Sequence, residues 1–224
     1  ARYDLRSLRH CTSAGEPLNP EVIRIWKEET GLPIYEGYGQ SETCACVATF
    51  PCMAHKPGSM GRPAPGWHIE LLDDEGKPVE QGIEGRIAIG LNPRPVGLFT
   101  EYLENPEANA ESFTGGFYYT GDKAYMDEDG YFWFVGRDDD VIKSSGYRIG
   151  PFEVESALQE HPAVQESAVV GSPDPLRGML VKAFIVLKAG HEPSDQLVRE
   201  IQKHVKRVTA PYKYPRLVEF VEEL

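Results

Sequence analysis

The sequence predicts a mixed fold that is α/β at its start and α+β at its end. Within about forty residues the chain alternates strand, helix and strand patterns, which is typical of a parallel sheet. After residue 57, short strand-like runs are separated by acidic turns that end in glycine. Beyond residue 137, helical and strand patterns alternate again. We therefore expect a piece of a parallel α/β subdomain, a small antiparallel β-barrel or sheet, and a small C-terminal α+β domain.

Two domains follow from these patterns. Residues 1–137 are predicted to form one domain, made of an α/β piece (1–56) and a barrel-like piece (57–137). Residues 138–224 form a second domain, of the size that a small α+β unit needs. The boundary is placed where a glycine and three successive aspartates follow a strand-like run.

The elements of the α/β piece are predicted in chain order. Residues 5–13 form a strand that runs into the loop at 13–17. Asn19 can cap a helix that has Pro20 at its first position and ends at Gly31. A second strand lies near Ile34 and Tyr35. Ligands gather at the carboxyl ends of parallel strands, so the segments that follow both strands are candidate binding segments.

The later elements are predicted from apolar runs and from a helix cap. Ser194 can cap a helix in the C-terminal domain. The expected strands are 67–72, 85–89, 131–135, 164–170, 181–187 and 217–221, and a further helix covers 151–160.

Charge and cysteine content exclude several classes of protein. The 23 Lys and Arg against 35 Asp and Glu give a net charge of −12, which argues against a nucleic-acid partner. No run is long and apolar enough to span a bilayer and no leader is recognisable, so a cytoplasmic protein that does not bind membranes is expected. Four cysteines are too sparse for a disulfide scaffold. Cys44, Cys46, Cys52 and His55 lack the paired spacing of zinc ligands, so core cysteines are the better interpretation.

The segment from Gly37 to Thr43 holds the most informative pattern. Gly37 and Gly39 permit backbone angles and close approaches that a Cβ would block. The hydroxyl of Ser41 can bind a phosphate oxygen, and the carboxylate of Glu42 can hold Mg²⁺. A dinucleotide fingerprint fails because Glu42 stands where its third glycine belongs. The hydrolase elbow G-x-S-x-G is matched except at Thr43, so a serine acyl hydrolase that uses Ser41 remains an alternative.

Five motifs in order resemble those of the adenylate-forming acyl-CoA synthetases, a superfamily that includes firefly luciferase and the adenylation domains of peptide synthetases. The resemblance covers the whole chain and is strongest to the medium-chain acyl-CoA synthetases. Five motifs in a fixed order are specific where each one alone is not. The motifs are SAGEP at 13–17, YGQSE at 38–42, YTGD at 119–122, GRDDD at 136–140 and KSSGYR at 143–148.

The resemblance implies an enzyme that joins a carboxylic acid to ATP and then passes the acyl group from AMP to coenzyme A. Ser41 and Glu42 would be catalytic, with Ser41 on the α-phosphate and Glu42 holding Mg²⁺. Asp122 would accept hydrogen bonds from the ribose hydroxyls, with Arg137 as a further donor to the sugar. The residues implied to flank adenine are Gly15, Glu16, Pro17, Gly37 and Tyr38.

The remaining implied roles concern the acid, the hinge and coenzyme A. Gly39 would open an acyl pocket for a medium-chain, branched or aryl acid. Asp139 would be the hinge about which the small domain swings. Ser145, Gly146 and Arg148 would bind coenzyme A. The expected partners are thus the acid, ATP and coenzyme A, with the oligomeric state left open.

Two features of the family have no counterpart in this sequence. The Gly, Ser and Thr-rich phosphate loop expected upstream of Gly15 is not found, and the sequence stops at Leu224, before the catalytic lysine of a Gly-Lys pair. We therefore expect a chain truncated inside its small domain that forms no acyl-adenylate by itself. A non-catalytic nucleotide-binding module remains a further alternative.

Overall fold

The computed structural model describes residues 3–138 and 140–224. The chain divides into two compact units, Ala1–Phe134 and Val135–Leu224, here called the N-terminal and C-terminal units. The division falls a few residues before the predicted boundary at 137. Each unit is described by itself.

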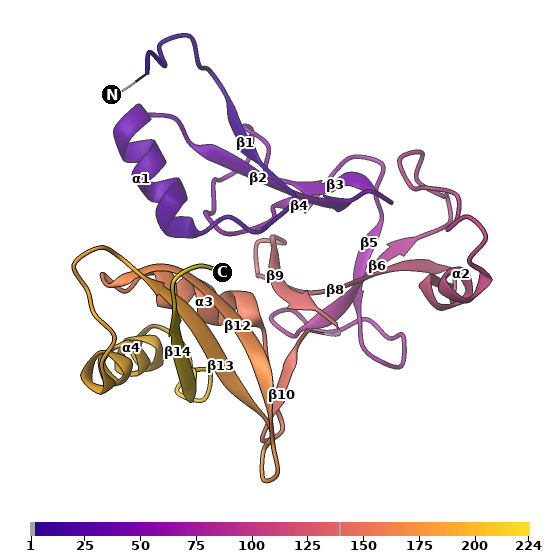
Figure 1. Ribbon diagram of the computed structural model, residues 1–224. Coiled ribbons are helices and arrows are strands. Elements are labelled where there is room, and N and C mark those ends of the chain that lie inside the picture. The colour runs from indigo at the N-terminus through magenta and orange to yellow at the C-terminus, as the bar shows by residue number, and fades with distance from the viewer. Residues whose placement is uncertain (1–2, 139) are drawn as a thin grey trace. The chain divides into compact units, whose positions relative to one another are not determined.

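The N-terminal unit opens with a four-stranded sheet of order β1-β2-β3-β4 (Figure 1). β1 is parallel to β2, whereas β3 is antiparallel to both of its neighbours. The predicted strand at 5–13 is shorter than expected, because residues 3–10 are all exposed and form a turn instead. The elements are β1 (Cys11–Ser13), α1 (Pro20–Thr30), β2 (Ile34–Gln40), β3 (Cys44–Ala48) and β4 (Arg62–Pro63).

Helix α1 begins and ends as its sequence predicts. The Oδ1 of Asn19 accepts a hydrogen bond from the N–H of Glu21 at 2.8 Å, and Pro20 occupies the first turn. Gly31 ends the helix in the left-handed conformation, with φ of 76°, and its N–H donates to the carbonyl of Lys27. Ile23 is fully buried and anchors the helix to the unit. The parallel α/β start that we predicted is confirmed.

The rest of the N-terminal unit is an antiparallel sheet of order β5-β6-β8-β7, in which β9 also pairs with β8. This sheet confirms the predicted antiparallel part, although the long central strand β8 was not foreseen. Its core includes Ile87, Ile89 and Tyr118, which are almost fully buried. The elements are β5 (Ile69–Leu72), β6 (Gly85–Gly90), α2 (Pro106–Ser112), β7 (Phe113–Thr114), β8 (Phe117–Met126) and the start of β9 (Phe132–Arg137), a strand that continues past the division of the chain at Phe134.

The C-terminal unit is an α+β structure with a five-stranded sheet. The order is β11-β10-β13-β12, and β14 lies parallel to β13. The Oγ of Ser194 accepts from the N–H of Leu197 at 3.2 Å, which confirms the predicted cap. The elements are β10 (Ile142–Ser144), β11 (Tyr147–Ile149), α3 (Pro151–Gln159), β12 (Val164–Asp174), β13 (Gly178–Leu187), α4 (Asp195–Val208) and β14 (Leu217–Val221).

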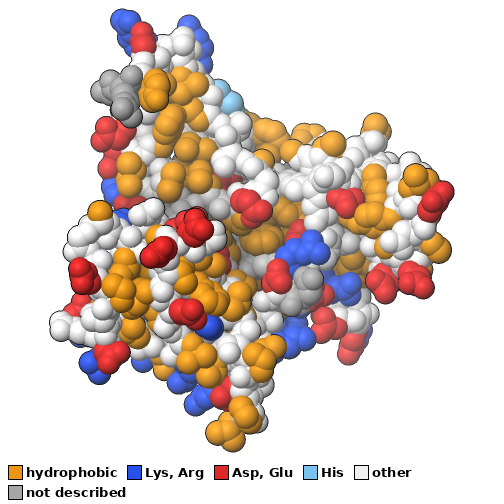
Figure 2. All heavy atoms as spheres, in the orientation of Figure 1, with side chains coloured by type: hydrophobic (Ala, Val, Ile, Leu, Met, Phe, Trp, Pro, Cys, Tyr) orange, Lys and Arg blue, Asp and Glu red, His pale blue; other side chains and the backbone are white. Residues whose placement is uncertain are grey.

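The acidic surface agrees with the sequence, whereas the predicted burial of the cysteines agrees only in part. Acidic side chains are spread over the face shown in Figure 2, in keeping with the net charge of −12. Cys46 is buried, but Cys44 and Cys52 are exposed, so the expectation of core cysteines is wrong for these two.

Within residues 3–138 and 140–224, no three His, Cys, Asp or Glu side chains are grouped to hold a metal ion. No helix in the described part of the chain is long and apolar enough to cross a membrane.

Gly37 and Gly39 lie inside β2, and neither has a positive φ. The expectation that they supply unusual backbone angles is therefore wrong. The close approach that we also expected is confirmed at Gly39, where β3 lies against β2. A Cβ on Gly39 would lie 1.6 Å from the carbonyl oxygen of Cys44, whereas a Cβ on Gly37 would meet only ordinary contacts, the nearest at 3.6 Å.

Glu36 is a buried carboxyl group beside the two candidate binding segments. Its Oε2 accepts a hydrogen bond from the N–H of Gly58 at 2.7 Å, and the N–H of Leu18 donates to the same carboxyl. Burial raises the pKa of Glu36 from 4.5 to about 7, although both N–H groups favour the charged form. At a pH between these two values, the folded chain therefore keeps a proton on Glu36 that the unfolded chain releases.

Replacing Gly39 by alanine is expected to destabilise the N-terminal unit by more than about 3 kcal/mol, because the clash is with backbone that cannot move aside cheaply. Gly37→Ala is the matched control and is expected to change the free energy of unfolding by less than about 1 kcal/mol. All three tryptophans, at positions 26, 67 and 133, lie in the N-terminal unit, so their fluorescence during guanidinium unfolding measures this unit. Equal effects of the two substitutions would contradict the prediction.

The second prediction concerns pH. Between pH 4.5 and about 7 the folded state binds the Glu36 proton and the unfolded state does not, so stability falls as pH rises through this window. The loss amounts to about 3 kcal/mol. Glu36→Gln has no such titration. The difference in unfolding free energy between the two chains, measured by tryptophan fluorescence, should therefore change over this window, and parallel pH curves would rule the prediction out.

Candidate functional site

The two predicted adenine-flanking segments leave the same edge of the first sheet. Ser13, the last residue of β1, pairs with Glu36 of the parallel strand β2. The loop that contains Gly15, Glu16 and Pro17 therefore leaves β1 at the level where β2 continues into Gly37. Gly15 has a φ of 98°, a left-handed conformation that favours glycine. The parallel register is what brings these segments to one edge.

Asp122 is the buried acidic residue of the site, with only 4% of its surface exposed. The hydroxyl of Tyr38 donates to its Oδ2 at 2.6 Å, and the Nε2 of Gln40 donates to the same oxygen at 2.8 Å. Burial, and next the charge of Asp122, raise the pKa of Tyr38, so this phenol stays a neutral donor. Asp122 lies within β8, so a strand holds its backbone in place.

Glu42 lies in the turn between β2 and β3. The fully buried Thr43 fixes this turn, since its Oγ1 accepts from the N–H of Gln40 at 2.9 Å and donates to the carbonyl of Cys44 at 2.9 Å. The hydroxyl of Tyr102 donates to the Oε1 of Glu42 at 3.0 Å. Ser41 is exposed, and its hydroxyl has no hydrogen-bond partner among the described residues.

A chain of side-chain contacts connects these two carboxylates. From Glu42 it runs to Tyr102, whose hydroxyl lies 3.3 Å from that of Tyr118. The hydroxyl of Tyr118 donates to the Oε1 of Gln40 at 3.3 Å, and Gln40 donates in turn to Asp122. We call Glu42, Tyr102, Tyr118, Gln40 and Asp122 the carboxylate network. It joins two acidic residues that are far apart in the sequence, both of which were predicted for the site.

The sequence did not identify the three middle members of the carboxylate network. Tyr102 and Tyr118 belong to the aromatic cluster around Phe99. Gln40 lies within a motif, but a neutral glutamine side chain does not by itself indicate a catalytic or metal-binding role. The available signal was position: Gln40 directly precedes Ser41, and Tyr118 lies four residues before Asp122.

Glu42 offers the kind of ligand that magnesium uses when it binds together with phosphate, which is a single carboxylate. Tyr102 occupies Oε1, and no other described side chain donates to the carboxylate. Magnesium prefers one or two carboxylates together with water and phosphate oxygens to a cage of protein ligands. A single carboxylate with a remaining oxygen therefore fits a magnesium ion that a nucleotide brings.

The other predicted site residues belong to the C-terminal unit. Arg137 ends β9 and is exposed. Ser145 and Gly146 form the two-residue loop between β10 and β11, with φ of 51° and 83°, as a type I′ hairpin turn requires. The Nη1 of Arg177 donates to the Oγ of Ser145 at 3.1 Å. Arg148 is exposed opposite Lys143. The predicted hinge residue Asp139 lies outside the described residues.

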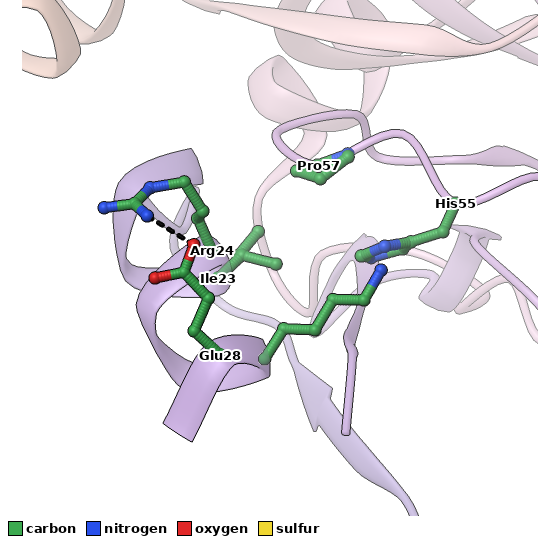
Figure 3. Close-up of a pocket in the computed structure, with 6 residues that line it drawn as sticks. Ile23, Arg24, Glu28, His55 and Pro57 are labelled. Atoms are coloured by element: carbon green, nitrogen blue, oxygen red, sulfur yellow. Dashed lines mark hydrogen bonds and ion pairs between the residues drawn. The ribbon is translucent and has the colours of Figure 1, made fainter. Parts of the chain in front are cut away.

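A cavity beside α1 lies apart from the predicted residues. In Figure 3, Arg24 and Glu28 of α1 form an ion pair at 2.5 Å, and His55 and Pro57 come from the loop opposite. The Nε2 of His55 lies 2.9 Å from the carbonyl of Ile34. The lining also includes Ile23 and Lys27. None of the lining residues was predicted for the site, so the cavity does not identify it.

Two family models match this chain. The model of the AMP-binding enzyme matches residues 1–103, and the model of the AMP-binding enzyme C-terminal domain matches residues 153–224. The mitochondrial acyl-coenzyme A synthetase ACSM3 of Rattus norvegicus is 61% identical over 99% of this chain. The 4-hydroxybutyrate–CoA ligase 1 of Metallosphaera sedula is 59% identical over 100% of it. The chain spans 39% of the length of the first relative and 40% of the second.

A solved structure shares the fold. The crystal structure of the anthranilate CoA ligase AuaEII, in complex with anthranoyl-AMP, matches with a TM-score of 0.91 and 42% identity. The match covers 100% of this chain and 42% of that one. The two family models and these similarities agree with the five ordered motifs. The chain therefore belongs to the AMP-binding enzyme family of adenylate-forming acyl-CoA synthetases, as part of a longer member.

Proposed function

We propose that the protein containing this chain is an AMP-forming acyl-CoA ligase. It activates a carboxylic acid with ATP as an acyl-adenylate and passes the acyl group to the thiol of coenzyme A. The observation that carries the proposal is the carboxylate network, which holds Glu42 and Asp122 at opposite ends of one set of contacts. A site for a nucleotide and its metal needs one carboxylate for the sugar and another for the metal.

The N-terminal unit carries the adenylation residues in this proposal. Asp122 accepts hydrogen bonds from the ribose hydroxyls, and Tyr38 fixes its carboxylate by donating to it. The loop of Gly15, Glu16 and Pro17 flanks adenine from one side and Gly37 from the other. Ser41 donates to the α-phosphate, a role that its exposed and unpaired hydroxyl supports.

Glu42 holds magnesium in this proposal. When bound, magnesium neutralises the charge that develops on the phosphate oxygens as the acid attacks. The part played by this chain is to orient the carboxylate: Tyr102 donates to its Oε1, and the turn fixed by Thr43 sets its backbone.

The C-terminal unit carries the thioester step in this proposal. Ser145 and Gly146 bind coenzyme A, with Arg148 on a phosphate, and Arg137 adds a donor to the ribose. The left-handed turn at Gly146 supports a close backbone approach, because an added Cβ would be strained there. Asp139 is the proposed hinge.

The acid is proposed by class only. The relatives include ligases named for 4-hydroxybutyrate and for anthranilate, which differ in size and shape. A medium-chain, branched or aryl acid fits this range. The close approach of Cys44 already accounts for the glycine at position 39, so Gly39 adds little support for an open acyl pocket. The Rattus relative is named as mitochondrial, and a cytoplasmic location for this protein stays a prediction.

Neither alternative is favoured by an observation of its own. A serine hydrolase needs a histidine that accepts the Ser41 proton, and no described histidine contacts Ser41. A nucleotide-binding module without activity has the same binding residues, so only turnover separates it from a ligase. The two experiments below distinguish all three.

Asp122→Asn in the full-length protein is expected to weaken AMP binding by about tenfold or more. The amide keeps the size of the side chain but loses the charge that strengthens hydrogen bonds from the ribose. Isothermal titration with AMP measures the effect. The matched control is Asp129→Asn, which removes a carboxylate of the same unit that pairs with Lys56 and lies outside the carboxylate network. Equal losses of affinity in the two variants would argue against the assigned role of Asp122.

Pyrophosphate release from ATP is expected from the full-length protein with at least one acid from a panel of octanoate, 4-hydroxybutyrate and anthranilate. The 224-residue chain alone is expected to release none, since it spans only about two fifths of its relatives. Binding of AMP without turnover on any acid would favour the non-catalytic module. Labelling of Ser41 by a fluorophosphonate would favour the hydrolase.

A further inference from the structure

We propose that Tyr102 is a positioning residue that holds the carboxylate of Glu42 in place for magnesium, an inference that rests on the proposed function. Two groups of one loop contact Glu42. The hydroxyl of Tyr102 donates to its Oε1 at 3.0 Å, and the N–H of Phe99 donates to its carbonyl at 2.8 Å. The loop therefore fixes both the side chain and the backbone of Glu42.

Tyr102 is itself fixed by a residue of α2. The N–H of Tyr102 donates to the Oδ1 of Asn109 at 2.7 Å, and the Nδ2 of Asn109 donates back to the carbonyl of Tyr102 at 2.8 Å. Two hydrogen bonds from one amide leave the Tyr102 backbone little freedom. The ring packs edge-on against Phe99, with centroids 4.7 Å apart. A group held this firmly can orient its partner, because orientation is lost if either side moves.

The hydroxyl protons of the carboxylate network can be assigned without conflict. Each phenol has a single proton, and Tyr102 uses its own on Glu42. Tyr118 can then donate either to the oxygen of Tyr102 or to the Oε1 of Gln40, which both lie 3.3 Å away. Burial raises the pKa of Tyr118, so its proton is retained. In either case the Tyr102 proton is the one that Glu42 receives.

A tyrosine that served only to fill the aromatic cluster would not need its hydroxyl. The ring contacts of Tyr102 and the fold around it would be kept by phenylalanine. The hydrogen bond to Glu42 would be lost, and no other described side chain donates to this carboxylate. Residues that orient a metal-binding carboxylate are commonly worth about ten- to a hundredfold in metal affinity. Removal of the hydroxyl therefore separates a positioning role from a packing role.

The experiment measures ATP binding by the full-length protein without any carboxylic acid, so that no turnover occurs. Isothermal titration across a series of Mg²⁺ concentrations gives the Mg²⁺ concentration for half-maximal binding. Tyr102→Phe is expected to raise this concentration about tenfold and to leave ATP binding without Mg²⁺ unchanged. Tyr119→Phe is the matched control, since this phenol directly follows Tyr118 in β8 but lies outside the carboxylate network.

Asn109→Ala provides a second variant that acts through Tyr102, and it should shift the Mg²⁺ dependence in the same direction. Thermal unfolding followed by tryptophan fluorescence confirms that each variant is folded. An unchanged Mg²⁺ dependence in Tyr102→Phe, in a protein whose unaltered form binds ATP, would overturn this inference alone. If the unaltered protein binds no ATP at any Mg²⁺ concentration, the proposed function falls and this inference falls with it.

Discussion

A buried carboxylate has to be paired, and the organisation of the N-terminal unit depends on how Asp122 is paired. Leaving this charge without donors would cost several kcal/mol of folding free energy. Tyr38 and Gln40 supply the donors, and both side chains come from β2. Because Asp122 lies in β8, these two hydrogen bonds tie the first sheet of the unit to the second. The hydrogen bond to Asp122 also orients Gln40, and Gln40 in turn positions the rest of the carboxylate network.

Strand β2 meets constraints on both sides. On one side it is parallel to β1, and this register places the Gly15 loop beside its carboxyl end. On the other side β3 approaches so closely at Gly39 that no Cβ fits against Cys44. Glu36 accepts hydrogen bonds from Leu18 of the same Gly15 loop and from Gly58 of one further loop. Because one strand satisfies so many requirements, substitutions in it act on folding and on the site together, and stability controls have to accompany every binding measurement.

The sequence was sufficient to predict features that depend on interactions between residues close together in the chain. Asn19, Gly31 and Ser194 act on residues next to them in the chain, so the helix ends could be predicted. Tyr102 could not be assigned a role, since its partner Glu42 lies sixty residues earlier and a half-buried tyrosine is usually a packing residue. A close approach at Gly39 was predicted, but the segment that makes it was not, because the contact depends on how β3 pairs with β2. Contacts between distant segments are thus what the sequence left undetermined.

The electrostatics of the proposed site make a cation necessary. Glu16, Glu42 and Asp122 are acidic, and no lysine or arginine occurs among the residues that we assign to adenine, ribose and phosphate in the N-terminal unit. A triphosphate brought to such a surface meets repulsion from a chain that already carries −12. The compensating charge has to come from magnesium or from basic residues outside this set, such as Arg137 and Arg148. Because exposed arginines are strongly screened by solvent, a magnesium ion held by a well-oriented Glu42 is the more effective source. In the proposed function, the orientation of that one carboxylate would therefore decide whether so acidic a chain binds ATP.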